Sequence, residues 1–303
     1  MKKFKAHIYT DIKDNFSIQT TSNIHLFCGK ALDDRGRELL KVFSEKSSTI
    51  HSVHFEPNTM QFSIDNKIVE FNNIEYLSEF INAENTIIID STTLGLPEIF
   101  YLIKQFIALS FLHFKIIYIE PLKYNKDESD DFYKLSHYPI GYKPIPGAVG
   151  DLHHDDLDLG VFFVGFDPSR MEIALEEFQM IQGKSIKTIF ATPAFNSGLE
   201  LESIVPHLNL LIDNRNFEID FCSALDPTSS FELLNYYKKS LDDGQKLFVA
   251  PLGTKPTTIA SALFANLHSK DVSLLYDHPL HLENRTIGVK EWHIYSIYLT
   301  PIQ

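Results

Sequence analysis

The stretch from residue 246 to 279 constrains the fold most strongly, because it reads as strand, tight turn, helix and strand. Its first strand is the short apolar run Leu247–Ala250, which is typical of a buried strand in a parallel sheet. The sequence Gly-Thr-Lys-Pro at 253–256 supplies a tight turn and a proline near the first helical position, where its missing N–H costs nothing. A helix to about Leu267 and a second strand at Val272–Tyr276 complete a βαβ unit.

A second stretch with the same order of elements lies earlier, at 86–121. Gly253 lies 158 residues after Gly95, and Pro279 lies 158 residues after Pro121. Equal offsets at both ends indicate an internal duplication with no net insertion inside the unit. The alternative is that two unrelated βαβ units share these features, because glycine and proline are common in such turns.

Apolar strands alternate with helices along much of the remaining chain. The strand at 24–28 runs into Gly29 and a helix whose cap is one of the two aspartates at 33–34, and 60–71 reads as a hairpin that turns at Asp65-Asn66. We therefore predict an α/β fold with two Rossmann-like, doubly wound parallel sheets related by internal duplication.

These elements predict two halves and a connection. Residues 1–121 form the first Rossmann-like half, 122–156 a connecting segment rich in charge, tyrosine, glycine and proline, and 157–303 the second Rossmann-like half. Residues 3–10 are predicted to form an edge strand. The alternating run at 289–299 is predicted to be an antiparallel addition at a sheet edge.

The overall charge limits the classes of partner. The 303 residues carry a formal net charge of −13, which argues against broad nucleic-acid binding because that binding depends on neutralising many phosphates. A local basic pocket for one small anion remains compatible with this charge. The chain shows no apolar run of about 18 residues and no signal peptide, so we expect no membrane association and a cytoplasmic protein. Its two cysteines, Cys28 and Cys222, read as small core residues.

Several common catalytic motifs are absent from the sequence. It contains no P-loop, no G-x-G-x-x-G dinucleotide fingerprint and no G-x-S-x-G nucleophile elbow. The sequence His-His-Asp-Asp at 153–156 is read as a solvated acidic loop rather than a metal site, because adjacent loop residues seldom converge on one ion. We therefore predict no metal site, and the sequence assigns no cofactor.

Four strand-to-helix turns are the candidate ligand contacts, because ligands of open α/β sheets bind beyond the carboxyl ends of the strands. The turns combine glycines, hydroxyls, cations and helix N-termini, which together suit a phosphate-bearing ligand. The alternative is that these residues serve only to build the turns. The predicted ligand-binding residues are Gly29, Arg35, Thr92, Thr93, Gly95, Gly165, Arg170, Gly253, Thr254 and Lys255.

Two of these turns resemble those of a known family. The sequences Asp-Ser-Thr-Thr-Leu-Gly at 90–95 and Pro-Leu-Gly-Thr-Lys-Pro at 251–256 resemble the turn after the fourth strand of CARF domains. The tandem arrangement is similar to SAVED domains, which look like two fused CARF units. These domains sense cyclic or linear oligonucleotide second messengers in bacterial antiviral defence.

The resemblance implies ligand contacts from Gly29 and its neighbours, Thr92–Gly95, Gly165 and its neighbours, and Gly253–Lys255. Members of this family usually carry a separate effector domain, for which this chain has no room, so the resemblance implies a separate effector protein.

Three hypotheses follow from the sequence. The first is a sensor that holds a nucleotide-like anion in a cleft between the halves and acts on a partner protein. Its contacts would be Arg35, Thr92, Thr93, Thr254 and Lys255. The second is an enzyme acting on a nucleotide or phosphorylated metabolite, with acid–base candidates Asp90, Asp277 and His278. The third is a structural subunit of a larger defence complex.

Overall fold

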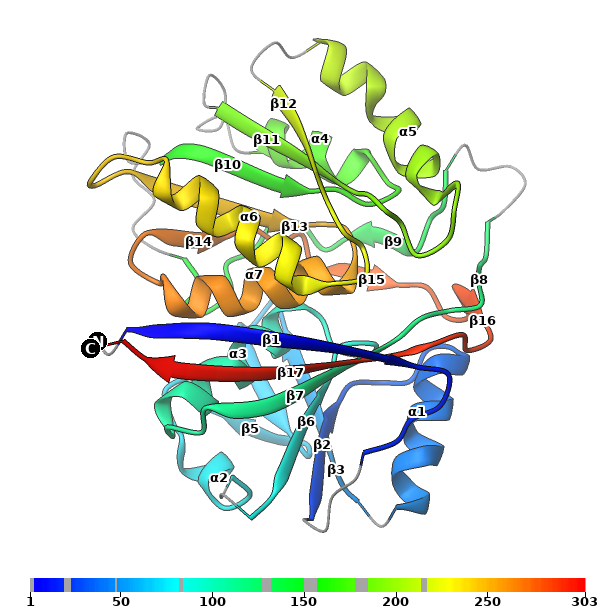
Figure 1. Ribbon diagram of the computed structural model, residues 1–303, viewed down its shortest axis with the longest axis vertical. Helices are drawn as coiled ribbons and strands as arrows, with labels where there is room; N and C mark the ends of the chain where they lie inside the picture. Colours follow the sequence, from blue (N-terminus) through cyan, green and yellow to red (C-terminus); the bar gives the residue numbers. More distant parts are fainter. Residues whose placement is uncertain are drawn as a thin grey trace. The chain divides into compact units, whose positions relative to one another are not determined.

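The computed structural model describes residues 3–18, 23–46, 48–81, 84–126, 132–149, 157–177, 185–213 and 217–302 (Figure 1). The chain forms two compact units. The first contains residues 1–124 and 283–303, and the second contains residues 125–282.

The first unit is built on a mixed sheet. Its strands are β1 (Phe4–Lys13), β2 (Ile24–Cys28), β3 (Thr49–Glu56), β4 (Gln61–Ile64), β5 (Lys67–Val69), β6 (Thr86–Asp90), β7 (His113–Ile119) and β17 (Trp292–Pro301), and its helices are α1 (Asp34–Glu45), α2 (Glu75–Ser78) and α3 (Leu96–Ala108). The sheet order is β1-β17-β7-β6-β2-β3-β4-β5. Strands β7, β6, β2 and β3 are parallel, and antiparallel strands extend this parallel centre on both sides. A separate short pair joins β8 (Lys123–Tyr124) to β16 (Thr286–Ile287).

Helices cover both faces of the parallel centre. Leu39 and Phe43 of α1 share a buried cluster with Leu26 of β2 on one face. On the other face, Phe106 of α3 contacts the ring of Phe27. The first unit is therefore a three-layer α/β structure over these four strands.

The second unit is built on a parallel sheet. Its strands are β10 (Leu157–Phe163), β11 (Ser185–Ala191), β12 (Phe217–Cys222), β13 (Lys246–Pro251) and β14 (Val272–Leu274), and its helices are α4 (Ser169–Glu177), α5 (Leu199–Asp213), α6 (Pro227–Lys239) and α7 (Lys255–Leu267). In the described part of the chain this sheet has five strands, all parallel, in the order β12-β11-β10-β13-β14. A short antiparallel pair joins β9 (Ser136–Pro139) to β15 (Pro279–His281).

Two pairs of helices cover this parallel sheet. Met171 of α4 and Ile204 of α5 join a buried cluster with Phe162 and Phe248 on one face. Helices α6 and α7 contact each other and lie over the other face (Figure 1). The strand order, read as 3-2-1-4-5 in chain order, is that of a Rossmann fold.

The structure corrects the predicted fold class in the first unit. The prediction of two Rossmann-like, doubly wound parallel sheets is right for the second unit, but the first unit has a mixed sheet. Figure 1 shows the cause: β1 and β17, from the two ends of the chain, lie side by side and extend the sheet with antiparallel pairing.

Some local predictions are confirmed and others are wrong. The hairpin turns at Asp65-Asn66, which both have positive φ, and Asp33 caps α1. Strand β1 is an edge strand as predicted, but β17 lies between β1 and β7 rather than at an edge. The predicted boundaries of the halves stay a prediction, since 127–131 and 150–156 lie outside the described residues.

The two βαβ units match with a different offset from the predicted one. Gly95 is the N-cap residue of α3, whereas the N-cap of α7 is Thr254, which lies 159 residues later. Each helix then has proline at its second position, Pro97 and Pro256. Gly95 therefore corresponds in helix position to Thr254 and not to Gly253.

None of the described helices is long and apolar enough to cross a lipid bilayer.

Candidate functional site

The parallel sheet has a topological switch point between β10 and β13. The helix after β10 packs on one face of the sheet, and the helix after β13 lies over the other (Figure 1). In open α/β sheets, ligands bind beyond the carboxyl ends of strands at such a point. The turns and helix starts after these two strands bring together predicted ligand-binding residues: Gly165, Arg170, Gly253, Thr254 and Lys255.

Two glycines let the turns approach each other closely. A Cβ atom at Gly165 would lie 2.9 Å from the carbonyl oxygen of Leu252, and one at Gly253 would lie 2.6 Å from that of Val164. Both distances are too short for a real Cβ contact with backbone. These glycines are therefore required for the turn-to-turn packing, whatever else the turns bind.

Thr254 and Lys255 begin α7 at this edge of the sheet. The Thr254 carbonyl accepts hydrogen bonds from Thr257 Oγ1 at 2.7 Å and from Thr258 N at 3.1 Å. The Thr254 side chain makes no capping bond, and its Oγ1 is buried with no hydrogen-bond partner among the described residues. A buried hydroxyl left in this state costs roughly 1–3 kcal/mol. Thr254 Oγ1 therefore has unused hydrogen-bonding capacity, and the half-buried Lys255 follows it in the chain.

Arg170 is engaged inside the protein rather than pointing to solvent. Its Nε and Nη2 donate to the two carboxylate oxygens of Asp277, both at 2.6 Å, and its Nη1 donates to the Leu252 carbonyl at 2.7 Å. Burial acts against the charged guanidinium, but the Asp277 carboxylate outweighs it and raises the pKa of Arg170. Arg170 therefore joins the turn after β13 to Asp277 in the segment that follows β14.

The acid–base candidates Asp277 and His278 are likewise buried. Asp277 is fully buried against Arg170. His278 has a φ of 49° and donates from Nε2 to the Lys143 carbonyl at 2.9 Å. Burial is the main cause that lowers the pKa of His278.

In the first unit, the turn after β6 is closed by its own hydrogen bonds. The carboxylate of Asp90 accepts from the backbone N of Thr92 at 2.8 Å, the backbone N of Thr93 at 3.2 Å and the Thr93 hydroxyl. Thr93 Oγ1 also accepts from Gly29 N at 2.8 Å, and Thr92 Oγ1 accepts from Ile119 N at 3.0 Å. Both predicted threonines thus have intramolecular partners, and burial raises the pKa of Asp90.

The other polar groups of this turn are engaged in the same way. Ser91 Oγ donates to the Ile117 carbonyl at 2.8 Å. Gly95 N donates to the carboxylate of Glu98 at 3.1 Å, which caps α3. Gly29 is required by packing, since a Cβ atom there would lie 2.7 Å from the Thr93 carbonyl oxygen.

Arg35 lies in a buried network at the start of α1. Its guanidinium contacts the Asp33 carboxylate at 2.6 Å and donates to the Ile119 carbonyl at 3.3 Å. Thr286 Oγ1 donates to the same carboxylate at 2.7 Å. Burial opposes ionisation of Asp33, but the hydrogen bond and charge of Arg35 outweigh it and lower the pKa of Asp33. Arg35 is 3 % exposed, so the structure gives it an internal role.

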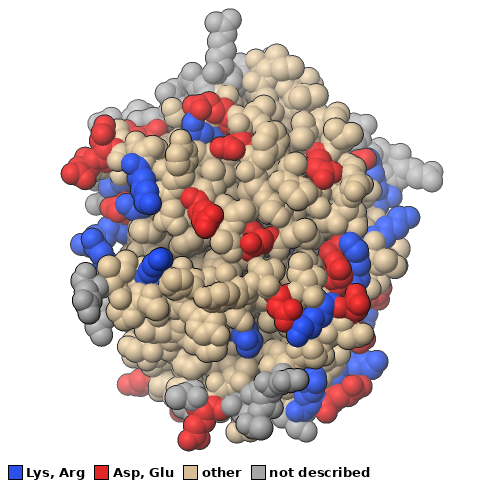
Figure 2. All heavy atoms as spheres, viewed as in Figure 1, with Lys and Arg blue, Asp and Glu red and all other residues tan. Residues whose placement is uncertain are grey.

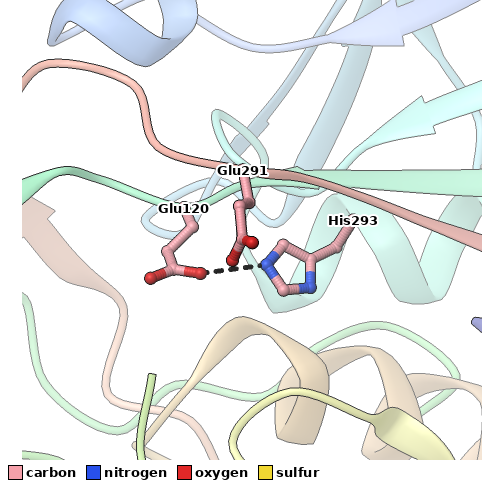
Figure 3. Close-up of side chains that lie close together, drawn as sticks. All are labelled: Glu120, Glu291 and His293. Carbon is pink, nitrogen blue, oxygen red and sulfur yellow. Dashed lines mark hydrogen bonds and ion pairs between the residues drawn. The ribbon is translucent and has the colours of Figure 1, made fainter. Parts of the chain in front are cut away.

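Sequence reasoning missed a cluster of Glu120, Glu291 and His293 in the first unit. Their ligand-type atoms lie within 4.8 Å of one another, and Figure 3 shows the three side chains converging. His293 Nε2 and Glu120 Oε2 are 3.2 Å apart, and Lys290 Nζ donates to Glu120 Oε1 at 2.7 Å. Burial opposes ionisation of Glu120, but the hydrogen bonds from His293 and Lys290 outweigh it and lower its pKa.

Only two sequence features pointed to this cluster. The spacing Glu291-x-His293 places two ligand-type side chains on one side of an extended chain, and Glu120 follows the apolar strand β7 directly. The motif at 153–156, which the sequence analysis read as a solvated loop, lies outside the described residues.

No protein-family model matches this chain, and no curated protein matches it.

Proposed function

We propose that this chain is a binding module that senses a nucleotide-like anionic ligand, with a cyclic oligonucleotide as the first candidate. One observation carries the proposal. At the switch point of the parallel sheet, the buried Thr254 hydroxyl has no partner among the described residues, and Lys255 follows it at the start of α7. A phosphate oxygen placed there would accept from the hydroxyl, pair with the ammonium and face a helix N-terminus.

The charge distribution supports a small anion rather than a long nucleic acid. On the face drawn in Figure 2, acidic and basic side chains are interspersed among uncharged residues. With a net charge of −13, affinity for an anion has to come from a local arrangement. Lys255 and the first turn of α7 supply such an arrangement.

A sensing role requires that ligand binding alter a second protein. The resemblance of residues 90–95 and 251–256 to CARF turns, and of the tandem arrangement to SAVED domains, supports a module that acts with a separate effector in antiviral defence. Ligand binding would stabilise one arrangement of the turn after β13 and so change the surface offered to that effector.

We also propose that the two units arose by duplication of one βαβ-containing ancestor. The support is a shared backbone device. Gly29 faces the Thr93 carbonyl in the first unit, and Gly165 faces the Leu252 carbonyl in the second. Thr93 and Leu252 are separated by the same 159 residues as the N-cap residues of α3 and α7.

We propose binding rather than catalysis because of the state of the acid–base candidates. Asp90, Asp277 and His278 are each buried and hydrogen-bonded inside the protein. If no compound binds, the chain is instead a structural subunit of a larger complex.

The test is the thermal midpoint of the full chain against a panel of mono-, di- and cyclic oligonucleotides. We expect a saturable rise with one class of compound, because a ligand that binds only the folded state stabilises it by mass action. In Lys255→Ala the rise should shrink or vanish at the same ligand concentration.

Lys246→Ala is the matched control. Lys246 is the first residue of β13, and Lys255 lies beyond the carboxyl end of that strand. The two lysines are therefore at opposite ends of the same strand. We expect this variant to respond as the wild type does. An equal response from Lys255→Ala would reject the proposed site, and no response from the wild type to any compound would reject the proposed function.

A further inference from the structure

We propose that Glu120, Glu291 and His293 form a binding site for a first-row divalent metal ion, with Zn²⁺ as the best fit. The proposal rests on the first unit alone and is independent of the nucleotide site. Two carboxylates and one imidazole offer ligand atoms within 4.8 Å of one another. Glu120 and His293 are fully buried, while Glu291 is partly exposed.

The backbone holds these side chains in place. Strand β17 pairs antiparallel with β7, and Trp292 lies opposite Ile119 at the end of that ladder. Beyond it, Glu120 N donates to the Glu291 carbonyl at 2.8 Å, and Lys290 N donates to the Glu120 carbonyl at 2.9 Å. The site is thus preorganised by two hydrogen-bonded segments rather than by a mobile loop.

The spacing of one donor pair, Glu120 and His293, fits tetrahedral coordination. Zinc binds imidazole nitrogen and carboxylate oxygen at about 2.0–2.1 Å, which separates two tetrahedral ligands by roughly 3.3 Å. Glu120 Oε2 and His293 Nε2 are 3.2 Å apart. An ion between them would replace their hydrogen bond, with the imidazole proton carried on Nδ1 so that the Nε2 lone pair faces the metal.

The set of donors selects the kind of ion. Mg²⁺ and Ca²⁺ prefer sites made of oxygen ligands, whereas an imidazole with carboxylates suits Zn²⁺ and its first-row neighbours. Three protein ligands leave a fourth position for water or a ligand, which is the pattern of an open zinc site.

Lys290 competes with a metal ion for the two carboxylates and also orients the Glu120 carboxylate. Its ammonium lies 2.7 Å from Glu120 Oε1 and 3.8 Å from a carboxylate oxygen of Glu291. The contact with Oε1 leaves Oε2 directed at His293, as hydrogen bonds to metal-ligating carboxylates do. The two carboxylates exceed the single ammonium by one negative charge, which favours a cation.

The test measures Zn²⁺ binding to the full chain by calorimetry, with Mg²⁺ as the comparison ion. We expect one Zn²⁺ per chain and no measurable Mg²⁺ binding. Glu291→Gln keeps the side-chain shape at a partly exposed position and so should fold, and it should weaken Zn²⁺ binding by about tenfold or more, since even groups that only support metal ligands contribute that much.

Glu283→Gln is the matched control, because Glu283 is an exposed glutamate of the same unit that pairs with Lys30. It should bind Zn²⁺ as the wild type does. A second readout is Co²⁺ bound in place of Zn²⁺, whose visible absorption reports tetrahedral coordination and should be lost in His293→Gln. Zn²⁺ binding that is absent from the wild type, or is unchanged in Glu291→Gln, would overturn the proposal and leave the cluster as an ion-pair network.

Discussion

The turn after β6 is held by the carboxylate of Asp90, which belongs to the turn itself. The turn after β13 is held by the guanidinium of Arg170, which comes from α4. In the first unit, Asp90 accepts hydrogen bonds from the threonines at 92–93, whose own hydroxyls are all engaged. In the second unit, Arg170 donates to the Leu252 carbonyl, and the Thr254 hydroxyl has no partner among the described residues.

This difference shows which of two turns with similar backbones has a hydroxyl left over for a ligand. In each unit a carbonyl of the turn faces a glycine from the turn of a neighbouring strand, Gly29 after β2 and Gly165 after β10, so the close approach itself says nothing about ligands. A hydroxyl that already has a donor and an acceptor contributes little more to a ligand, while an unpartnered buried hydroxyl gains a full hydrogen bond. The second unit is therefore the place to test for binding.

Removing the carboxylate that anchors the turn after β13 should have the largest effect on stability. Asp277→Ala leaves the Arg170 guanidinium buried without its ion pair, and breaking a buried pair in this way costs about 3–5 kcal/mol. Urea denaturation of the full chain measures the loss. In the control, Asp271→Ala removes a partly exposed partner of Lys238 and should cost under about 1 kcal/mol. Equal effects of the two variants would mean that the turn is not held from outside.

Asp90→Asn tests the internal support of the turn after β6. The asparagine keeps one acceptor oxygen but turns an NH₂ group toward donors, so we expect a loss of about 2–3 kcal/mol in the free energy of unfolding. The same denaturation experiment measures it. A loss below about 1 kcal/mol would contradict the claim that this carboxylate holds the turn.

The dependence of stability on pH distinguishes the two carboxylates, because the pKa of Asp33 is lowered and the pKa of Asp90 is raised. The pKa of Asp33 is lowered on folding, so its contribution to stability is present above the unfolded value near 3.8 and is lost as the pH falls through the folded pKa. Burial raises the pKa of Asp90 on folding. Its contribution to stability is therefore present below the unfolded pKa and is lost as the pH rises through the folded pKa.

Stability curves between pH 6 and pH 2.5 would therefore separate the two residues. Asp33→Asn should flatten the decline in stability on acidification, and Asp90→Asn should steepen it. Two variants with the same slope would contradict these directions.

The smallest stability effect is expected at Thr254. Thr254→Val removes an unpartnered buried hydroxyl and keeps the branched shape, so the free energy of unfolding should stay equal or rise by up to about 1 kcal/mol. Thr93→Val removes a hydroxyl that bonds Asp90 and Gly29 N, and should lower it by about 1–2 kcal/mol. Thermal and urea denaturation of this pair compare the two turns directly. Equal losses would show that Thr254 also has a structural partner.

Local elements could be predicted from the sequence because their signals are local. The apolar run of β13, the glycine turn and the proline of α7 predicted one βαβ unit, and Asp65-Asn66 predicted the hairpin. The residues at the switch point of the second unit followed from the rule for strand ends.

Features that join distant residues could not be predicted in this way. The place of β17 between β1 and β7 depends on pairing between the two chain ends. The Arg170–Asp277 pair spans 107 residues, and the contact of Glu120 with His293 spans 173. Likewise, turn composition at 90–95 and 251–256 cannot tell which hydroxyls have partners, because some partners, such as Ile117 and Ile119 of β7, come from another strand.

The affinity of Thr254→Val for the nucleotide that gives the largest thermal shift tests the central claim most directly. The matched control is Thr188→Val, which removes another buried threonine hydroxyl without a described partner, in the middle of β11. We predict that Thr254→Val folds normally and binds about tenfold or more weakly, the loss expected for one hydrogen bond to a charged group, while Thr188→Val binds as the wild type does. Equal affinity in all three proteins would contradict the assignment of the ligand to the turn after β13.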